Sequence, residues 1–162
     1  MTSPWAGVIS QEDESRYERA GFGRSSGLGN RPALLIIDVQ YRTLGNSPKP
    51  IDQALEDYTT AVGEEGWKAV EHIKVLLDFF RESDLPVLFP HVAPKQSYDV
   101  GTLGAKVPSI LNIPEQGYRM PPELQPQSHD VMLPKKHPSA FFGTPLASYL
   151  IDLGVDTLVI TG

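Results

Sequence analysis

Residues 33–38 form the run Ala33-Leu34-Leu35-Ile36-Ile37-Asp38, in which five apolar residues lead directly into a carboxylate. The run does not alternate between apolar and polar residues, which is typical of a parallel strand buried on both faces. Similar short apolar runs occur at residues 87–89, 131–133 and 157–160. We therefore predict four strands, with residues 33–37 forming a central one.

Helical patterns separate these runs. Between residues 67 and 81, apolar side chains recur at spacings of three and four, which predicts a helix with one buried face: Val70, Ile73, Leu77 and Phe80. A weaker helical pattern covers residues 53–62. Strands that alternate with helices predict an α/β fold, in which helices cover both faces of a parallel sheet.

A further helix is predicted after Thr144. Threonine favours the N-cap position, Pro145 suits the first helical position, and Gly154 is a good C-terminal stop. Its expected buried face consists of Leu146, Tyr149, Leu150 and Leu153.

The chain of 162 residues suits one domain, preceded by a polar, glycine-rich arm at residues 1–30. The stretch from Gly21 to Gly29 resembles a phosphate-binding glycine loop. Such a loop follows a strand and opens a helix, whereas this stretch precedes the first strand. We therefore interpret residues 1–30 as a structural arm.

Composition narrows the function classes. The sequence holds no cysteine, which excludes a disulfide-stapled scaffold and cysteine-ligated metal sites. Its formal net charge is -6, and no basic stripe is present, so we expect neither nucleic acid nor anionic membrane as a partner. No apolar run approaches the roughly 20 residues that cross a bilayer, and no signal peptide is visible, so a cytoplasmic location is expected.

Polar residues follow the predicted strands at the edge where open parallel sheets bind ligands. Asp38 ends the first strand, and its partly desolvated carboxylate would suit a general base, although an aspartate here can also cap a turn. Lys135 and Lys136 follow the third strand. A lysine close to Asp38 would keep the carboxylate ionised and could polarise a substrate carbonyl, although lysines after strands are usually solvated.

Other candidates surround this edge. Gln40 and the side chains of Tyr41, Arg42, Phe141 and Phe142 could line a pocket, although aromatic residues at strand ends more often pack in the core. The four histidines are dispersed, and none forms a pair at metal-ligand spacing. We expect no metal site.

Three stretches in this order resemble the isochorismatase-like cysteine hydrolases: RPALLIIDVQ (31–40), LPKKHPSAFFGTPL (133–146) and LGVDTLVITG (153–162). The arm before Arg31 looks most like the branch of N-carbamoylsarcosine amidase and maleamate amidohydrolase. The resemblance implies a three-layer α/β/α sandwich with a six-stranded parallel sheet. It implies residues 31–162 as the hydrolase domain, incomplete at its C-terminus.

The resemblance also implies an Asp–Lys–Cys triad that cleaves a non-peptide C–N bond of a small amide or ureido substrate. The family aspartate falls on Asp38. The family lysine falls on Lys135, with Lys136 as the alternative if the register slips by one residue. The family cysteine would lie just past Gly162, so we expect the chain to be part of a longer protein and inactive alone. The resemblance implies no cofactor and a homo-oligomer.

Two other functions compete with this one. A catalytically inactive family member could act as a binding or assembly subunit, and the lack of any cysteine in these 162 residues favours that alternative. A nucleotide-binding α/β domain would need a glycine loop after the first strand, and residues 38–43 contain no glycine.

Overall fold

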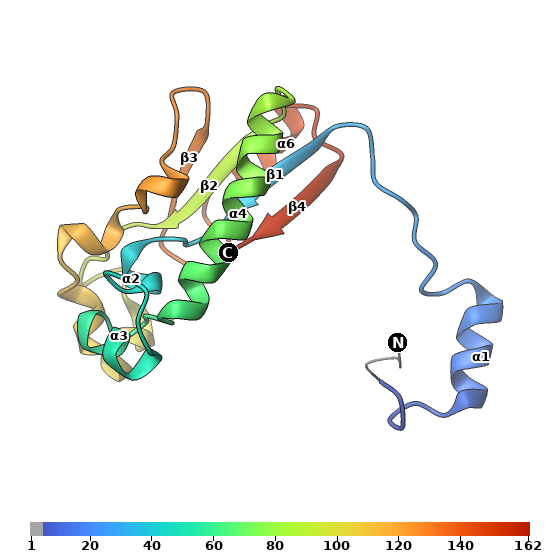
Figure 1. Cartoon of the computed structure of the whole chain (residues 1–162), viewed down its shortest axis with the longest axis horizontal. Helices are drawn as coiled ribbons and strands as arrows, with labels where there is room; N and C mark the ends of the chain where they lie inside the picture. The colour runs from blue at the N-terminus through green and yellow to red at the C-terminus, as the bar shows by residue number, and fades with distance from the viewer. Residues whose placement is uncertain (1–4) are drawn as a thin grey trace.

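The computed structural model describes residues 5–162, so the first four residues of the predicted arm lie outside the described part of the chain (Figure 1). Its strands are β1 (Pro32–Ile36), β2 (Val87–Val92), β3 (Val131–Lys135) and β4 (Thr157–Thr161). Its α-helices are α1 (Gln11–Ala20), α2 (Tyr41–Leu44), α3 (Ile51–Asp57), α4 (Glu64–Glu82), α5 (Gly101–Lys106) and α6 (Leu146–Asp152). Three short 3₁₀ helices are η1 (Pro108–Leu111), η2 (Glu115–Tyr118) and η3 (Pro122–Leu124).

The four strands form one parallel sheet in the order β3-β2-β1-β4. Strand β1 is central, because it pairs with β2 through Leu34↔Val87 and with β4 through Leu34↔Val159. The chain moves outward from β1 to β3 and then returns to the other side of β1. This reversal places a topological switch point, where open α/β sheets bind ligands, at the carboxyl ends of β1 and β4.

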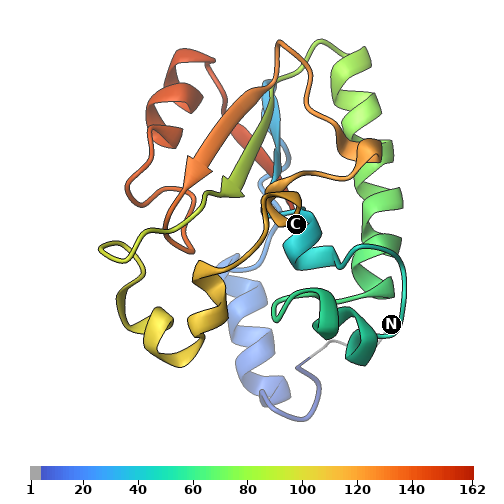
Figure 2. The ribbon, with the colours of Figure 1, turned by 90° about the vertical axis from the view of Figure 1, so that its left-hand side faces the viewer.

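Helices cover both faces of the sheet, as predicted (Figure 2). Leu34 and Ile36 pack in the core under α4, whereas Ala33 and Leu35 pack in the second core with Leu146 of α6. All four β1 side chains are essentially inaccessible to solvent. Each buried leucine or isoleucine contributes roughly 1.5–3 kcal/mol of transfer free energy, which explains why an unbroken apolar run occupies the middle strand.

Helix α4 confirms the strongest sequence pattern. Its buried residues are the four that the spacing predicted: Val70, Ile73, Leu77 and Phe80. The helix begins at Glu64, three residues earlier than predicted, and its first turn is acidic, which suits the positive end of the helix dipole.

The prediction for α6 was only partly correct. The helix begins at Leu146, with Pro145 at the N-cap, although the Thr144 hydroxyl still accepts a hydrogen bond from the Leu146 backbone at 3.2 Å. Of the expected apolar face only Leu146 is buried, and Tyr149 is 37% exposed. Gly154 does end the helix at φ +65°, where a left-handed residue closes the C-terminal turn.

Two shorter helices differ from the sequence prediction. Helix α3 covers residues 51–57 rather than 53–62, because Tyr58 takes an extended backbone and buries its ring beside Ala54 and Ala61. Helix α1 was not predicted at all. The signal for it was a capping pattern at Ser10, whose hydroxyl accepts a hydrogen bond from the Asp13 backbone.

The N-terminal arm stands apart from the sheet, with α1 at its far end (Figure 1). Residues 21–29 lead into β1, as expected for an arm and unlike a phosphate loop. The arm is fixed where it meets the body, because the Asp156 carboxylate accepts hydrogen bonds from the backbones of Asn30 and Arg31. These bonds lower the pKa of Asp156 below its ordinary value.

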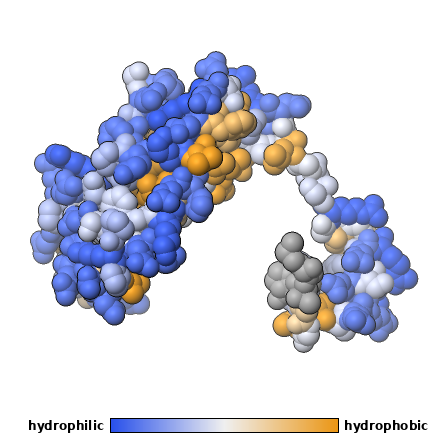
Figure 3. All heavy atoms as spheres, in the orientation of Figure 1, coloured by the Kyte–Doolittle hydropathy of each residue, from blue (hydrophilic) through white to orange (hydrophobic). Residues whose placement is uncertain are grey.

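Apolar side chains also reach the surface over β4, beside α4 (Figure 3). Ile160 of β4 is 62% exposed, whereas the equivalent residues of β1 are buried. Within residues 5–162, none of the helices combines the length and apolar character needed to cross a membrane.

Candidate active site

Asp38 lies where the backbone leaves β1 between its two neighbours. The Ile37 backbone donates to Thr161 of β4, and the Asp38 backbone donates to Pro90 of β2, both at 2.9 Å. Asp38 has φ +58°, in the left-handed region. Aspartate tolerates this region better than most residues, and such conformations cluster at functional sites. The sheet edge therefore fixes the carboxylate at the switch point.

Lys135 meets Asp38 across the carboxyl edge of the sheet. Its ammonium nitrogen lies 2.7 Å from Asp38 Oδ2, and its side chain is 1% exposed. The same nitrogen donates to the carbonyls of His137 and Pro138, each at 3.2 Å. All three ammonium hydrogens therefore have acceptors, which leaves none for the carbonyl of a substrate. This geometry favours action through Asp38 over direct polarisation.

The second oxygen of the carboxylate is in a different situation. Asp38 Oδ1 is buried and has no hydrogen-bond partner among residues 5–162. Buried polar atoms are normally paired, so each exception needs an explanation. The carboxylate thus combines one oxygen locked by an ammonium group with one vacant acceptor.

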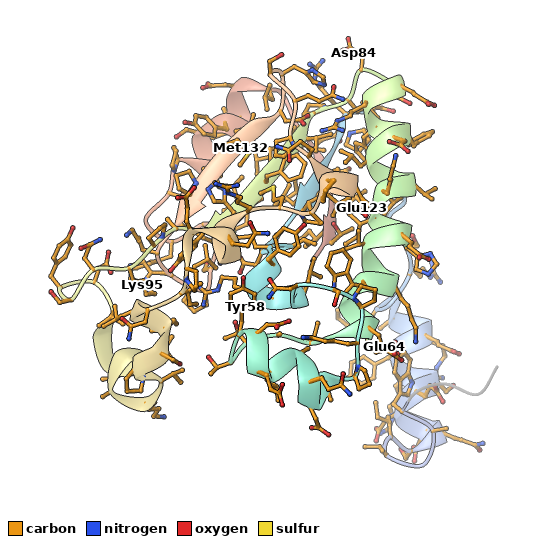
Figure 4. The ribbon with its side chains drawn as sticks, turned by 60° about the vertical axis from the view of Figure 1, so that its left-hand side comes forward. Tyr58, Glu64, Asp84, Lys95, Glu123 and Met132 are labelled. Atoms are coloured by element: carbon orange, nitrogen blue, oxygen red, sulfur yellow. The ribbon has the colours of Figure 1, made fainter. Side chains whose placement is uncertain are left out.

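Lys136, the alternative in the sequence, points elsewhere. Its ammonium nitrogen lies 3.0 Å from Asp99 Oδ2, and the bond lowers the pKa of the Asp99 carboxyl below its ordinary value. Lys95 donates to the backbone of Lys136 and to that of Asp99. These bonds hold the loop after β2 against the end of β3, and Figure 4 shows Lys95 on that loop.

Asp38 and Lys135 line a cavity of about 440 Å³. Its other walls come from the segment that precedes α4, the loop after β2 and the residues after β3, including Thr60, Val92, Ile110 and His137. Four cationic side chains and two acidic ones line it: Arg42, Lys95, Lys135, Lys136, Asp38 and Asp99. The cavity is therefore positive, although the whole chain is acidic.

Arg42 is the most buried of the unpaired cations in this wall. It is 4% exposed, and its guanidinium carbon lies 5.6 Å from the centre of the Tyr118 ring. Nη1 is buried without a hydrogen-bond partner in the described residues. Burial lowers the pKa of Arg42, while Tyr118 and Asp38 oppose that shift.

Gln40 lies beside the site with its amide directed into the protein. Its side chain donates to the carbonyls of Val92 and Tyr118 and accepts from the Val92 backbone. The residue is 0% exposed and joins the ends of β1 and β2 to η2. Substrate binding by Gln40 stays a prediction, and these contacts favour a structural role.

The three predicted aromatic residues are not among the cavity-lining residues. Tyr41 packs against Trp67, with ring centres 6.0 Å apart, and lines a separate hollow with His91 and Met120. Phe141 and Phe142 are 52% and 63% exposed, and Phe142 packs edge-on against His137. Their predicted role in substrate binding has no support from this arrangement. Within residues 5–162 we find no group of three acidic or histidine side chains positioned to hold a metal ion.

A comparison with protein families places this site. The profile of the isochorismatase domain matches residues 32–162. The chain belongs to the isochorismatase family. Maleamate amidohydrolase from Pseudomonas putida is 32% identical over 146 residues, which cover 87% of this chain and 63% of that protein. N-carbamoylsarcosine amidase from an Arthrobacter species is 27% identical over 91% of this chain and 54% of that protein.

Solved structures of the isochorismatase family share the fold. N-carbamoylsarcosine amidase from Thermoplasma acidophilum has a TM-score of 0.63 and 25% identity, covering 82% of this chain and 68% of that one. A cysteine hydrolase from Pseudomonas syringae has a TM-score of 0.64 at 22% identity, covering 86% and 65%. The chain spans between 54% and 63% of the length of the two amidases that it matches in sequence.

Sequence reasoning missed one wall of the site in this family member. Lys95, Asp99 and Ile110 come from a loop-rich segment without periodicity, so no sequence pattern distinguished them from solvated residues. Their position follows from the carboxyl end of β2, which delivers this loop to the edge that carries Asp38.

Proposed function

We propose that this protein is part of an amidohydrolase that cleaves the C–N bond of a small amide or ureido compound. Asp38 is the general base, and Lys135 holds it in place. The observation that carries the proposal is the divided carboxylate: Oδ2 is bound to a fully satisfied ammonium group, and Oδ1 is buried without a partner. A base needs this arrangement, because it must be fixed in position and must keep one oxygen available for a proton.

The proposed nucleophile is a cysteine thiol that follows Gly162. The 162 residues contain no cysteine, and the matched amidases are considerably longer than this chain. The site leaves room for such a residue, because β4 runs beside β1 and brings Gly162 against the Ile37 carbonyl, one residue before Asp38. We call this chain together with that thiol the active enzyme.

In the proposed reaction, Asp38 Oδ1 takes the thiol proton and the thiolate attacks the carbonyl carbon. The C–N bond breaks, and the leaving nitrogen takes the proton from Asp38 to depart as ammonia. Water then hydrolyses the thioester and releases the acyl or carbamoyl group. Lys135 stabilises the carboxylate before and after each transfer and keeps it oriented. General base catalysis of this kind contributes about 10²–10⁴-fold in rate.

The first experiment is to read the coding sequence past Gly162. We expect a cysteine codon within about ten codons, in line with a nucleophile at the start of a helix. If the gene continues without one, the thiol mechanism is wrong.

The second experiment measures ammonia release by the active enzyme from N-carbamoylsarcosine, maleamate and a ureido acid. Lys135→Met should lower kcat by at least 100-fold, whereas Lys136→Met, the neighbouring control, should change it by less than tenfold. Equal losses in the two variants would show that the contact with Asp38 has no special role.

The alternative is a non-catalytic binding or assembly subunit of this family. The absence of any cysteine from the 162 residues favours it. Under this alternative the coding sequence supplies no thiol, and the chain still binds small amides in the cavity without releasing ammonia.

A further inference from the structure

Arg42 presents a problem that the proposed reaction does not use. It belongs to α2, four residues after Asp38, and lines the same cavity. Its side chain is more than nine-tenths buried, and its Nη1 donor has no acceptor in residues 5–162. A guanidinium group stays charged in proteins, so this is a buried positive charge with an unused hydrogen-bond donor.

The surrounding side chains do not neutralise this charge. Asp38 is bound to Lys135, and Asp99 is bound to Lys136. Arg42 has no ion pair with an acidic side chain in the described part of the chain, and neither has Lys95. The Tyr118 ring offers only the weaker attraction between a cation and an aromatic face. Removing a charge from water without a counter-ion is costly, so the cavity wall is incomplete in its present state.

We propose that Arg42 binds a carboxylate of the substrate, and that the substrate is therefore an amide or ureido acid. The guanidinium fork matches a carboxylate in shape, and its donors form two parallel hydrogen bonds with such a group. The negative group would also balance the excess positive charge of the cavity. The inference rests on the proposed function only for the reacting end of the substrate, because the anion site follows from Arg42 itself.

The positions of the two groups give the substrate a direction. Asp38 and Arg42 line one cavity but form no ion pair within 4.0 Å, so a ligand can lie between them. The scissile carbonyl faces Asp38, and the carboxylate faces Arg42. Lys95, on the loop after β2, adds a second positive charge to the same wall.

The test measures binding to this 162-residue chain with two matched probes. Maleamate carries an amide and a carboxylate, and maleamide is its neutral diamide. Isothermal titration should show that the wild-type chain binds maleamate at least tenfold more tightly than maleamide. Arg42→Gln should abolish this preference, whereas Arg24→Gln, a control at an exposed arginine of the arm, should keep it. Equal affinities in the wild-type chain, or a preference that survives Arg42→Gln, would overturn the proposal.

Melting curves identify a variant that does not fold. If Arg42→Gln is unfolded, Arg42→Lys decides the matter, because it keeps the charge and loses the fork. It should retain the preference for maleamate in weaker form, by threefold or more. An unchanged maleamate affinity in Arg42→Lys would mean that the guanidinium only packs on Tyr118.

Turnover by the active enzyme separates this inference from the proposed function. Arg42→Gln should raise the KM for maleamate at least tenfold and leave the kcat for maleamide within threefold. Hydrolysis of both amides with equal efficiency, unaffected by the substitution, would refute the role of Arg42 and leave the amidohydrolase proposal intact. A preference for maleamate in binding without any ammonia release would support the anion site and refute the hydrolase.

Discussion

Two buried acid–base pairs lie at opposite edges of the sheet. Lys135 and Asp38 meet at the carboxyl edge, whereas Arg81, in the last turn of α4, meets Asp130 just before β3 at the amino edge. Both pairs join distant segments, and in both the aspartate Oδ1 has no hydrogen-bond partner among residues 5–162. An ion pair with an unsatisfied oxygen is therefore not sufficient evidence of a catalytic site.

The surroundings of the two pairs differ. Asp130 is 0% exposed at its side chain and caps a local turn by accepting from the Gln127 backbone, while Arg81 donates to the Gln125 carbonyl. Asp38 is 29% exposed at its side chain, has a left-handed backbone and lines the positive cavity. The amino-edge pair closes a turn, whereas the carboxyl-edge pair faces a space that can hold a ligand. Position on the sheet distinguishes their roles.

The largest expected effect comes from removing the base at the carboxyl edge. Asp38→Asn in the active enzyme should lower kcat by about 10²–10⁴-fold, because the amide cannot take the thiol proton. Ammonia release is the measurement. Asp78→Asn, on the exposed face of α4, is the control and should keep normal turnover. Substantial activity in Asp38→Asn would remove the base from the mechanism.

The second effect concerns stability at the amino edge. Arg81→Met leaves the buried Asp130 carboxylate without its counter-ion, and breaking a buried pair in this way costs about 3–5 kcal/mol. Urea denaturation of the 162-residue chain measures this loss. In the active enzyme, kcat should stay within a factor of about three below the unfolding transition, because the pair lies away from the cavity. A fall in kcat as large as that of Asp38→Asn would contradict the distinction between the two edges.

Gln40 tests how the carboxyl edge is held together. Gln40→Leu removes three hydrogen bonds and leaves the Val92 and Tyr118 backbone groups unpaired, which should cost about 1–3 kcal/mol. The free energy of unfolding is the measurement. Gln53→Leu, on an exposed position of α3, should stay near the wild-type value. A neutral result at Gln40 would favour its predicted role as a substrate ligand.

The smallest effect is expected at the junction with the arm. The backbones of Asn30 and Arg31 lower the pKa of Asp156, so the ionised carboxylate is the form that the folded junction prefers. This stabilisation is present above the ordinary pKa and is lost as the pH falls through the lowered one. Amide hydrogen exchange of Asn30 and Arg31 at pH 6 should be severalfold faster in Asp156→Asn. Unchanged protection would show that the strand alone orders these residues.

Much of the fold could be predicted because it depends on local periodicity. The unbroken run at residues 33–37 identified β1, and the spacing of Val70, Ile73, Leu77 and Phe80 identified α4 with its buried face. The predictions failed where packing rather than periodicity decides. Helix α3 ends early because Tyr58 becomes buried, and α6 buries only Leu146 of its expected face.

The candidate site shows the same division. The sequence placed Asp38 and Lys135 at strand ends, and the parallel order of the sheet brought them together. The role of Gln40 could not be predicted, because its hydrogen-bond partners are backbone groups 52 and 78 residues away along the chain. The positive charge of the cavity was equally invisible in a chain whose net charge is -6.

The sequence by itself determined which residues could form strands and helices and which of them carry charge at the strand ends, because side-chain type and spacing are local properties. Only the tertiary structure decided which charges are paired. Lys135 and Lys136 are neighbours in the chain, yet one reaches Asp38 and the other Asp99, because successive side chains leave the end of a strand in different directions. The vacant oxygen of Asp38 and the unpaired guanidinium of Arg42 are consequences of that choice.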